Sequence, residues 1–502
     1  MEFRNYINGQ WTEAHGGEWF DTLNPATGQP IGRAALSTRE DALAAVEAGQ
    51  KAYRAWRLTP APKRGEYLYE FGRLIRERKE EIARFLTMEM GKVLPEARGD
   101  VQEAVDMAFY MAGEGRRLFG VTVPSELPNK FAMAVRDSIG VCGVITPWNF
   151  PIAIPSWKIF PAIMAGNTVV FKPSGETPGL ATKFVEIFHE IGLPPGVVNL
   201  VHGPGAEVGE VLVEHPAVKV VSFTGSTRTG RIIAERAGRL NKKVHLEMGG
   251  KNAIIVMDDA DLDLALEGIL WSAFGTSGQR CTAASRVIVH RAVKPALTER
   301  LVARVQALRL GDGLLPTTDV GPVINQAALD KIHGYTGVAR GEGAQVLLGG
   351  EVWRNGGGFF YQPTIFDGVT PSQRVFQEEI FGPCTSLVTV DSLEEAIAAN
   401  NSVAYGLSSS LYTANVNRAF QAIRDFDTGL VYINHGTIGA EIQLPFGGTK
   451  GTGNGHREAG IAGLDVFTEW KSIYVDYSGR LQRAQIDTDA LTGAANPPPL
   501  AD

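Results

Sequence analysis

A cysteine preceded by small and polar residues is the feature of this sequence best suited to nucleophilic chemistry. The turn 275–280 follows an apolar, helix-like run and leads directly into Cys281. Small residues let a substrate approach the sulfur, and the neighbouring Arg280 favours the thiolate, the reactive form of cysteine. A single cysteine is also often a small buried apolar residue, which fits Cys142 and Cys384 in their apolar or Gly/Pro surroundings. The turn alone leaves both interpretations of Cys281 open.

Two glycine-rich turns follow predicted strands and are candidates for binding phosphate. Residues 203–209 (GPGAEVG) come after the apolar run 197–201, and residues 225–230 (GSTRTG) come after 218–223. Either turn can present backbone N–H groups and a helix N-terminus to a phosphate. Neither contains the full GxGxxG fingerprint, and tight packing of a strand against a helix also requires glycine. The glycines therefore suggest a nucleotide site without establishing one.

Strands alternate with helices through most of the chain, which predicts two α/β domains. Amphipathic stretches such as 178–191 and 206–214 separate runs rich in Val and Ile, and repeated β–α units of this kind pack as doubly wound, mostly parallel sheets. We expect the boundary between the domains near Gly249 and Gly250. The expected strands are 141–145, 168–171, 197–201, 218–223, 253–256, 286–289 and 386–390.

The flanking segments predict further helices and a late strand. Ser37 and Glu40 are spaced as a capping box that begins a helix, and another helix is expected over 96–118. Residues 465–477 carry aromatic and β-branched side chains, which is typical of a strand.

Composition and charge exclude several classes of protein. The 502 residues are too many for one hydrophobic core, and the hydrophobic (44%) and charged (21%) fractions are those of a globular protein. The net charge of −7 argues against nucleic acid as a partner. Three cysteines in so long a chain do not form a disulfide framework, and no CxxC or Cys/His cluster has metal-ligand spacing. With neither a signal peptide nor a long apolar span, we expect a cytoplasmic protein without a metal site or a membrane partner.

Seven short blocks, taken together in their order and spacing, resemble the aldehyde dehydrogenase superfamily over about residues 3–477. The blocks are TPWNFP (146–151), FKPS (171–174), FTGST (223–227), LEMGGK (246–251), GQRC (278–281), EEIFGP (378–383) and PFGG (445–448). The resemblance implies oxidation of a small-molecule aldehyde to a carboxylic acid with reduction of NAD(P)+. The fold would be α/β, with a Rossmann-like cofactor domain, an α/β catalytic domain and a small β oligomerisation domain.

The matched positions imply which residues carry the chemistry. Cys281 would attack the aldehyde carbonyl, and the Asn149 amide with the Cys281 backbone N–H would hold the oxyanion. After hydride transfer, Glu247 would act as the general base that activates water to hydrolyse the thioester. Relatives that pass the acyl group to coenzyme A typically lack this base. Glu458, with Lys158, resembles the family's proton-relay glutamate, although one residue is inserted in the turn before it. The alternatives are a non-catalytic structural or binding member of the fold and a coenzyme A-acylating enzyme.

The resemblance also implies a site for NAD or NADP. Lys172 would contact the adenine ribose, Glu379 would hold the nicotinamide ribose, and Phe381 would flank the nicotinamide. Gly175 stands where NAD-selective relatives usually have a glutamate that binds the 2′-hydroxyl and repels a 2′-phosphate, so we expect NADP to be accepted beside NAD. The full set of expected cofactor-binding residues is Ile145, Trp148, Lys172, Ser174, Gly175, Gly225, Ser226, Gly230, Glu379 and Phe381.

The substrate side is expected to combine aromatic residues with a carboxylate-binding group. Phe150, Trp157 and Phe446 match positions that line the aldehyde tunnel of relatives, although each would also suit core packing. Arg280 and the loop 436–441 resemble the branch that includes the 2-aminoadipate and 2-oxoglutarate semialdehyde dehydrogenases. An arginine or a nest of backbone N–H groups there can hold a distal carboxylate. We expect an acidic semialdehyde or a medium-chain aldehyde as the substrate.

By the same resemblance the chain is expected to form a homodimer or homotetramer. The expected division is residues 1–125 and 142–248 for the cofactor-binding domain, 249–447 for the catalytic domain, 126–141 and 465–478 for the oligomerisation strands, and 479–502 for a C-terminal tail. That tail is expected either to be disordered or to lie across the aldehyde entrance of a neighbouring subunit.

Overall fold

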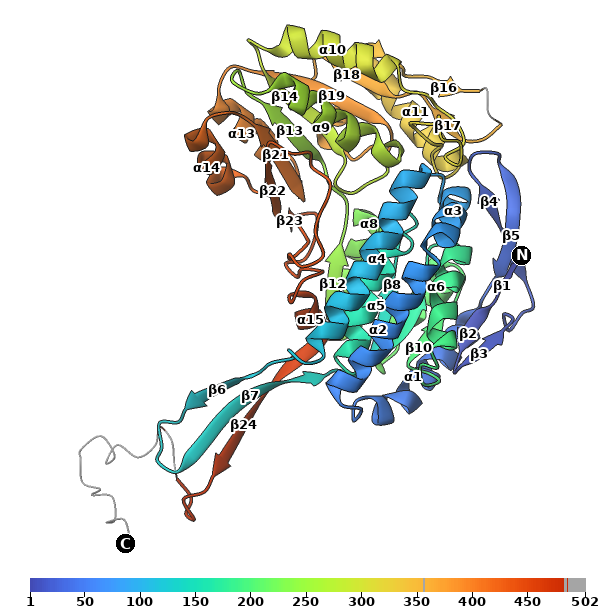
Figure 1. Ribbon diagram of the computed structural model, residues 1–502, viewed down its shortest axis with the longest axis vertical. Helices are drawn as coiled ribbons and strands as arrows, with labels where there is room; N and C mark the ends of the chain where they lie inside the picture. The colour runs from blue at the N-terminus through green and yellow to red at the C-terminus, as the bar shows by residue number, and fades with distance from the viewer. Residues whose placement is uncertain (355–356, 483–484, 486–502) are drawn as a thin grey trace, which may run out of the picture.

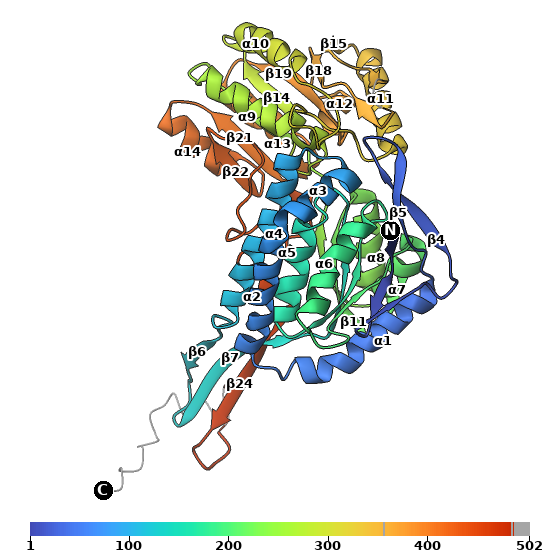
Figure 2. The ribbon, with the colours of Figure 1, turned by 45° about the vertical axis from the view of Figure 1, so that its right-hand side comes forward.

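Two large sheets, each covered by helices, form two lobes, and a narrow third sheet extends away from one of them (Figure 1). The computed structural model describes residues 1–354, 357–482 and 485. Most of the expected tail 479–502 therefore lies outside the described residues. Turning the molecule shows the same two lobes and the same projecting arm (Figure 2).

The first sheet has seven strands, of which the five from β12 to β10 are parallel. Its central strands are almost wholly apolar because helices bury both faces of a parallel sheet. In spatial order the strands are β12 (Lys243–Glu247), β11 (Val218–Thr224), β8 (Val141–Ile145), β9 (Thr168–Lys172), β10 (Val198–Leu200), β2 (Asn5–Ile7) and β3 (Gln10–Thr12). The helices of this lobe are α1 (Arg39–Trp56), α2 (Ala61–Glu77), α3 (Lys79–Met90), α4 (Leu94–Glu114), α5 (Ala153–Met164), α6 (Pro178–Glu190), α7 (Glu210–Glu214) and α8 (Thr227–Arg239).

The second sheet also has seven strands, and only its edge strand β15 runs antiparallel to its neighbour. In spatial order the strands are β15 (Gln345–Leu348), β18 (Thr364–Asp367), β19 (Cys384–Val390), β14 (Ala284–His290), β13 (Asn252–Val256), β21 (Ser408–Tyr412) and β22 (Leu430–Ile433). The helices of this lobe are α9 (Leu262–Phe274), α10 (Lys294–Gln306), α11 (Gln326–Gly341), α12 (Arg374–Gln377), α13 (Leu393–Asn401) and α14 (Val416–Asp425). The expected α/β fold with two mostly parallel sheets is confirmed.

The projecting arm is a three-stranded antiparallel sheet with many exposed apolar side chains. It consists of β6 (Val121–Pro124), β7 (Lys130–Ser138) and β24 (Thr468–Asp476), with β7 in the middle. Because β6 pairs with β7, the arm begins before residue 126, where the expected oligomerisation strands started.

Several expected element boundaries are wrong. The helix expected over 96–118 is α4, which ends at Glu114, and the strand expected from residue 465 is preceded by the short helix α15 (Gly463–Val466). Helix α1 is capped one residue later than expected, since the Asp41 carboxylate accepts a hydrogen bond from the Thr38 N–H at 2.9 Å. The Ser37 hydroxyl instead bonds the Asn5 side chain.

The connection from β12 to β13 joins the two lobes. It brings one edge of the first sheet opposite one edge of the second. Residues that follow β8, β11 and β12 lie at the carboxyl edge of the first sheet, where ligands bind in doubly wound folds. Residues that precede β13, β14 and β19 lie at the amino edge of the second sheet. Within the described residues, no helix is both long and apolar enough to cross a membrane.

Candidate active site

Cys281 lies in a tight turn between α9 and β14. Thr276 and Ser277 in this turn adopt left-handed backbone conformations, with φ of 52° and 54°. The Glu96 carboxylate of α4 accepts hydrogen bonds from the Thr276 N–H at 2.8 Å and from its hydroxyl at 3.1 Å. The Asn252 amide donates to the Cys281 carbonyl at 2.7 Å. These contacts hold a strained turn in one conformation, and no sequence pattern points to the roles of Glu96 and Asn252.

The electrostatic surroundings of Cys281 differ from those expected. Burial, together with the carboxylates of Glu247 and Glu379, raises the pKa of the Cys281 thiol above its usual range. The Arg280 guanidinium lies 3.2 Å from the Glu96 carboxylate, so its charge is compensated. The expectation that Arg280 favours the thiolate is therefore wrong for this structure, and a base must take the thiol proton.

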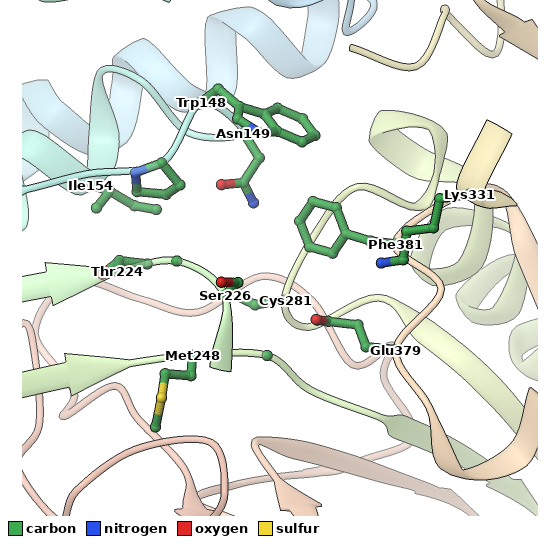
Figure 3. Close-up of a pocket in the computed structure, with 13 residues that line it drawn as sticks. Trp148, Asn149, Ile154, Thr224, Ser226, Met248, Cys281, Lys331, Glu379 and Phe381 are labelled. Carbon is green, nitrogen blue, oxygen red and sulfur yellow. The ribbon is translucent and has the colours of Figure 1, made fainter. Parts of the chain in front are cut away.

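Asn149 follows β8 and directs its side-chain amide to the cysteine turn. Its Nδ2 donates to the Gln279 carbonyl at 3.1 Å. Gln279 is itself fixed, because its side chain accepts a hydrogen bond from the Ile324 N–H at 2.9 Å. The Asn149 amide points into a cavity whose wall includes Cys281 (Figure 3). An oxyanion formed on a carbon bound to the sulfur would find an N–H donor there.

Glu247 ends β12 and lies in the same cavity wall as Cys281. Among the described residues neither of its carboxylate oxygens has a hydrogen-bond partner. Burial and the nearby Glu458 carboxylate raise the pKa of Glu247 well above its usual value. Gly447 has a φ of 146°, and a Cβ there would lie 2.6 Å from Oε1 of Glu247, so a larger residue would be strained and would displace the carboxylate. The result is a buried carboxylate with high proton affinity beside a thiol.

A long cavity of about 1170 Å³ runs along the carboxyl edge of the first sheet. The N-terminus of α8 opens on it, where the Ser226 hydroxyl caps the helix by accepting a bond from the Thr229 N–H at 3.2 Å. Burial lowers the pKa of Lys172 to about 8. A helix N-terminus, close-approaching glycine backbone and an amine suit a phosphate-bearing ligand. The expected cofactor residues in this wall are Ile145, Trp148, Lys172, Ser174, Gly175, Gly225 and Ser226.

A neighbouring cavity of about 670 Å³ contains Glu379 and Phe381 together with Cys281. Oε1 of Glu379 accepts a hydrogen bond from the Gly250 N–H at 3.0 Å. A Cβ at Gly249 would overlap the same carboxylate, so a larger residue there would displace Glu379 from this position. Figure 3 shows the Glu379 carboxylate pointing into the cavity. Lys331 of α11 also lines this wall, and nothing in the sequence identified it.

One expected cofactor residue, Gly230, lies elsewhere. Gly230 is buried in α8, where a Cβ would lie 2.4 Å from the Met248 sulfur, so this glycine serves helix packing and does not line the cavity. The carboxylate of Glu176 accepts a bond from the Asn325 amide at 2.8 Å and is absent from the cavity wall, so Gly175 leaves that position without a negative charge.

A third cavity, of about 600 Å³, meets the previous one at Cys281. Its wall includes the expected substrate residues Phe150, Trp157, Arg280 and Phe446, together with Glu247. The Trp157 and Phe446 rings pack edge to face with their centroids 5.1 Å apart, and the Arg280 guanidinium lies 5.3 Å from the Phe150 ring centroid. Glu103 of α4 joins the same wall, and burial raises its pKa to about 8. No group of three or more His, Cys, Asp or Glu side chains in the described part of the chain could hold a metal ion.

Comparisons with known proteins give one consistent result. The sequence profile of the Aldehyde dehydrogenase family matches residues 11–473. The alpha-ketoglutaric semialdehyde dehydrogenase of Bacillus subtilis (strain 168) is 44% identical over 477 residues, which are 94% of this chain and 98% of the relative. The succinate-semialdehyde dehydrogenase [NADP(+)] of Escherichia coli (strain K12) is 38% identical, with 93% and 97% covered. A crystal structure of betaine aldehyde dehydrogenase from Staphylococcus aureus in complex with NAD+ superposes with a TM-score of 0.93 at 34% identity, covering 95% of this chain and 96% of the other.

Proposed function

Because the chain belongs to the aldehyde dehydrogenase family, we propose that it oxidises a semialdehyde with a distal carboxylate to the corresponding diacid, with NAD(P)+ as the oxidant. The observation that carries this proposal is the position of Cys281 at the junction of two cavities. One cavity contains Glu379 and Phe381, and the other contains Glu247 and Arg280. A nucleophile placed there meets an aldehyde from one side and a hydride acceptor from the other.

In the proposed mechanism three side chains act in sequence. The Cys281 sulfur attacks the aldehyde carbon, and the thiol proton leaves to a base, for which the high proton affinity of Glu247 is suited. The Asn149 amide and the Cys281 N–H stabilise the oxyanion of the thiohemiacetal. When bound, the nicotinamide cofactor supplies the hydride acceptor. Glu247 first releases the thiol proton to solvent and then takes a proton from water, which attacks the thioester carbon. The Cys281 thiolate leaves and the carboxylic acid is released.

The long cavity fits a dinucleotide with or without a 2′-phosphate. The solved relative from Staphylococcus aureus contains NAD+, and the name of the Escherichia coli relative specifies NADP(+). The carboxylate in the wall of this cavity is Glu210, which forms an ion pair with the Arg236 guanidinium at 2.6 Å. This arrangement supports use of both cofactors by this enzyme.

Support for an acidic semialdehyde comes from Arg280 and from the relatives. The Bacillus subtilis relative is named for alpha-ketoglutaric semialdehyde. Arg280 is the cationic side chain in the wall of the third cavity, and a guanidinium binds a carboxylate through two parallel hydrogen bonds. Gly439 and Ala440 bring backbone from the loop 436–441 to the same wall. The substrate carboxylate would replace Glu96 as the acceptor for some of the Arg280 N–H groups.

The experiment compares an acidic and a neutral aldehyde of similar length in an Arg280→Leu variant. We expect KM for alpha-ketoglutaric semialdehyde to rise about 10- to 100-fold, as expected for losing a charge-assisted pair, whereas KM for pentanal changes less than about threefold. Equal changes for both aldehydes would show that Arg280 only supports the cysteine turn and would contradict the substrate assignment.

The arm and the cysteines support two further assignments. We propose a homodimer or homotetramer formed through the arm, whose exposed side chains include Trp470 and Tyr474, 52% and 67% exposed. Three free cysteines fit a reducing cytoplasm. The proposed division into functional domains is residues 1–125, apart from strand β6 of the arm, with 142–248 for the cofactor, and 249–447 for catalysis.

A further inference from the structure

A histidine two residues before the general base lies inside a buried polar cluster. His245 and Glu247 are on β12, and alternate residues of a strand point to the same face. The His245 ring is 1% exposed and lies between two carboxylates. Its Nε2 is 3.6 Å from Oε1 of Glu247, and its Nδ1 is 3.5 Å from Oε1 of Glu458. The family resemblance assigned no role to this residue.

The hydrogen bonds around His245 bear on which ring nitrogen carries the proton, because the Ser222 hydroxyl hydrogen needs an acceptor and Nδ1 is within reach. The Lys158 ammonium, which is paired with the Glu458 carboxylate, donates to the Ser222 hydroxyl oxygen at 3.1 Å. An ammonium has no acceptor, so Ser222 must accept this bond, and its own hydrogen is free to donate to Nδ1 of His245 at 3.1 Å. Burial and the Lys158 charge hold the pKa of His245 well below its usual range, so the ring is neutral with one proton. We assign that proton to Nε2, the nitrogen that faces Glu247.

The two groups that face each other are both without another partner. Nε2 of His245 and both oxygens of Glu247 make no hydrogen bond in the described residues. An ionised carboxylate buried without a donor is costly, so a nearby N–H changes its proton affinity. Closing the gap from 3.6 Å to a hydrogen bond requires a movement of about 0.5 Å.

We propose that His245 is a positioning residue for the general base: its Nε2–H donates to the ionised Glu247 carboxylate and connects it, through Ser222, to the Lys158–Glu458 pair. The inference rests on the proposed role of Glu247 in thioester hydrolysis. The Lys158 → Ser222 → His245 → Glu247 chain of donors then favours the form of the base that can accept a proton from water.

The other charged and titratable groups near Glu247 are on several elements. From the turn before α15, Glu458 raises the pKa of Glu247 whereas Arg457 lowers it, and Lys158 of α5 also lowers it. The His456 ring centroid lies 6.2 Å from that of His245, and the Cys281 thiol faces the base from its own turn. None of these side chains donates a hydrogen bond to Glu247, which leaves the Nε2–H as the donor oriented to it among the described residues.

The test follows decay of the acyl-enzyme on Cys281 against pH, by quenched flow and intact mass, in His245→Leu, His245→Gln and Ser222→Ala. In His245→Leu we expect the acid limb of the decay rate to move up by about one to two pH units, with the rate recovered at high pH. His245→Gln retains an N–H donor and should shift less. Ser222→Ala removes the hydroxyl that donates to Nδ1, so the ring proton is no longer held on Nε2, and the acid limb should shift in the same direction. The matched control is His15→Leu, at an exposed histidine far from the site, which should leave the profile unchanged.

The size of the NADH burst separates this inference from the proposed function. A wild-type enzyme that forms neither NADH nor an acyl adduct on Cys281 would contradict the proposed function itself. A normal burst in His245→Leu together with an acid limb that does not move would overturn the role of His245. A normal burst with an equal loss of decay rate at every pH would do the same, and so would loss of the burst in that variant alone. If a melting scan shows that His245→Leu is unfolded, the shifts in Ser222→Ala and His245→Gln decide, and no shift in Ser222→Ala overturns the proposal.

Discussion

Replacing Glu96 by alanine should reduce activity although Glu96 does not touch the reacting atoms. The carboxylate receives two hydrogen bonds from Thr276, at 2.8 and 3.1 Å, and an ion pair from Arg280 at 3.2 Å. Thr276 is buried and has a left-handed backbone, so the variant leaves a strained turn with an unpaired N–H. Loss of charge-assisted bonds to a buried group costs about 2–3 kcal/mol. If that energy is lost from the active conformation of the turn, kcat/KM falls about 30- to 150-fold.

The assay is NADH formation under kcat/KM conditions, combined with the rate of Cys281 alkylation by iodoacetamide. The time course of Cys281 alkylation should no longer fit a single rate constant, because the turn samples more than one conformation. The control is Asp106→Ala, an exposed residue on the same helix whose carboxylate bonds only Gln102 in the described structure. A Glu96→Ala enzyme with kcat/KM within about twofold of the wild type would refute the argument that this carboxylate holds the turn.

Three further predictions concern the cofactor and the arm. Gly175→Glu should lower kcat/KM with NADP at least about 100-fold, because the new carboxylate repels a 2′-phosphate. The value with NAD should change little, because a Cβ at this position meets only the Phe20 ring, at 3.7 Å. Equal losses with both cofactors would argue against this pocket geometry. Burial lowers the pKa of Lys172 to about 8, so its charge is present below that pH and lost above it, and KM for NADP should rise as the pH passes through 8; a KM that stays flat from pH 7 to 9 contradicts the assigned contact. A Trp470→Glu and Tyr474→Glu double variant should elute as a smaller species in light-scattering chromatography, and an unchanged mass would exclude the arm as the interface.

The fold class and the location of the site were accessible from the sequence because they depend on short local patterns. Val- and Ile-rich runs such as 141–145 mark buried parallel strands, and the block GQRC identified the turn of Cys281. Element ends were less accessible. The N-cap of α1 is Thr38 and not Ser37, because Ser37 bonds Asn5 from another part of the chain.

Residues that act on the site from distant segments could not be found in this way. Glu96 is 180 residues from Thr276, and His245 becomes notable only when Ser222 and Glu458 are seen on either side of its ring. The interpretation of Arg280 also depended on tertiary contacts. From the sequence its charge was expected to favour the thiolate, but in the structure the Glu96 carboxylate lies beside it and compensates that charge.

The central claim is that Cys281 carries the acyl group and that Glu247 is needed to hydrolyse it. The direct measurement is a rapid-mixing trace of NADH with a Glu247→Gln enzyme and alpha-ketoglutaric semialdehyde, followed by intact mass of the protein. We predict about one NADH per subunit, formed more slowly than in the wild type because the amide cannot take the thiol proton, almost no further turnover, and an acyl adduct on Cys281 that is absent in Cys281→Ala. Continued turnover in Glu247→Gln, or NADH formation in Cys281→Ala, would contradict the account.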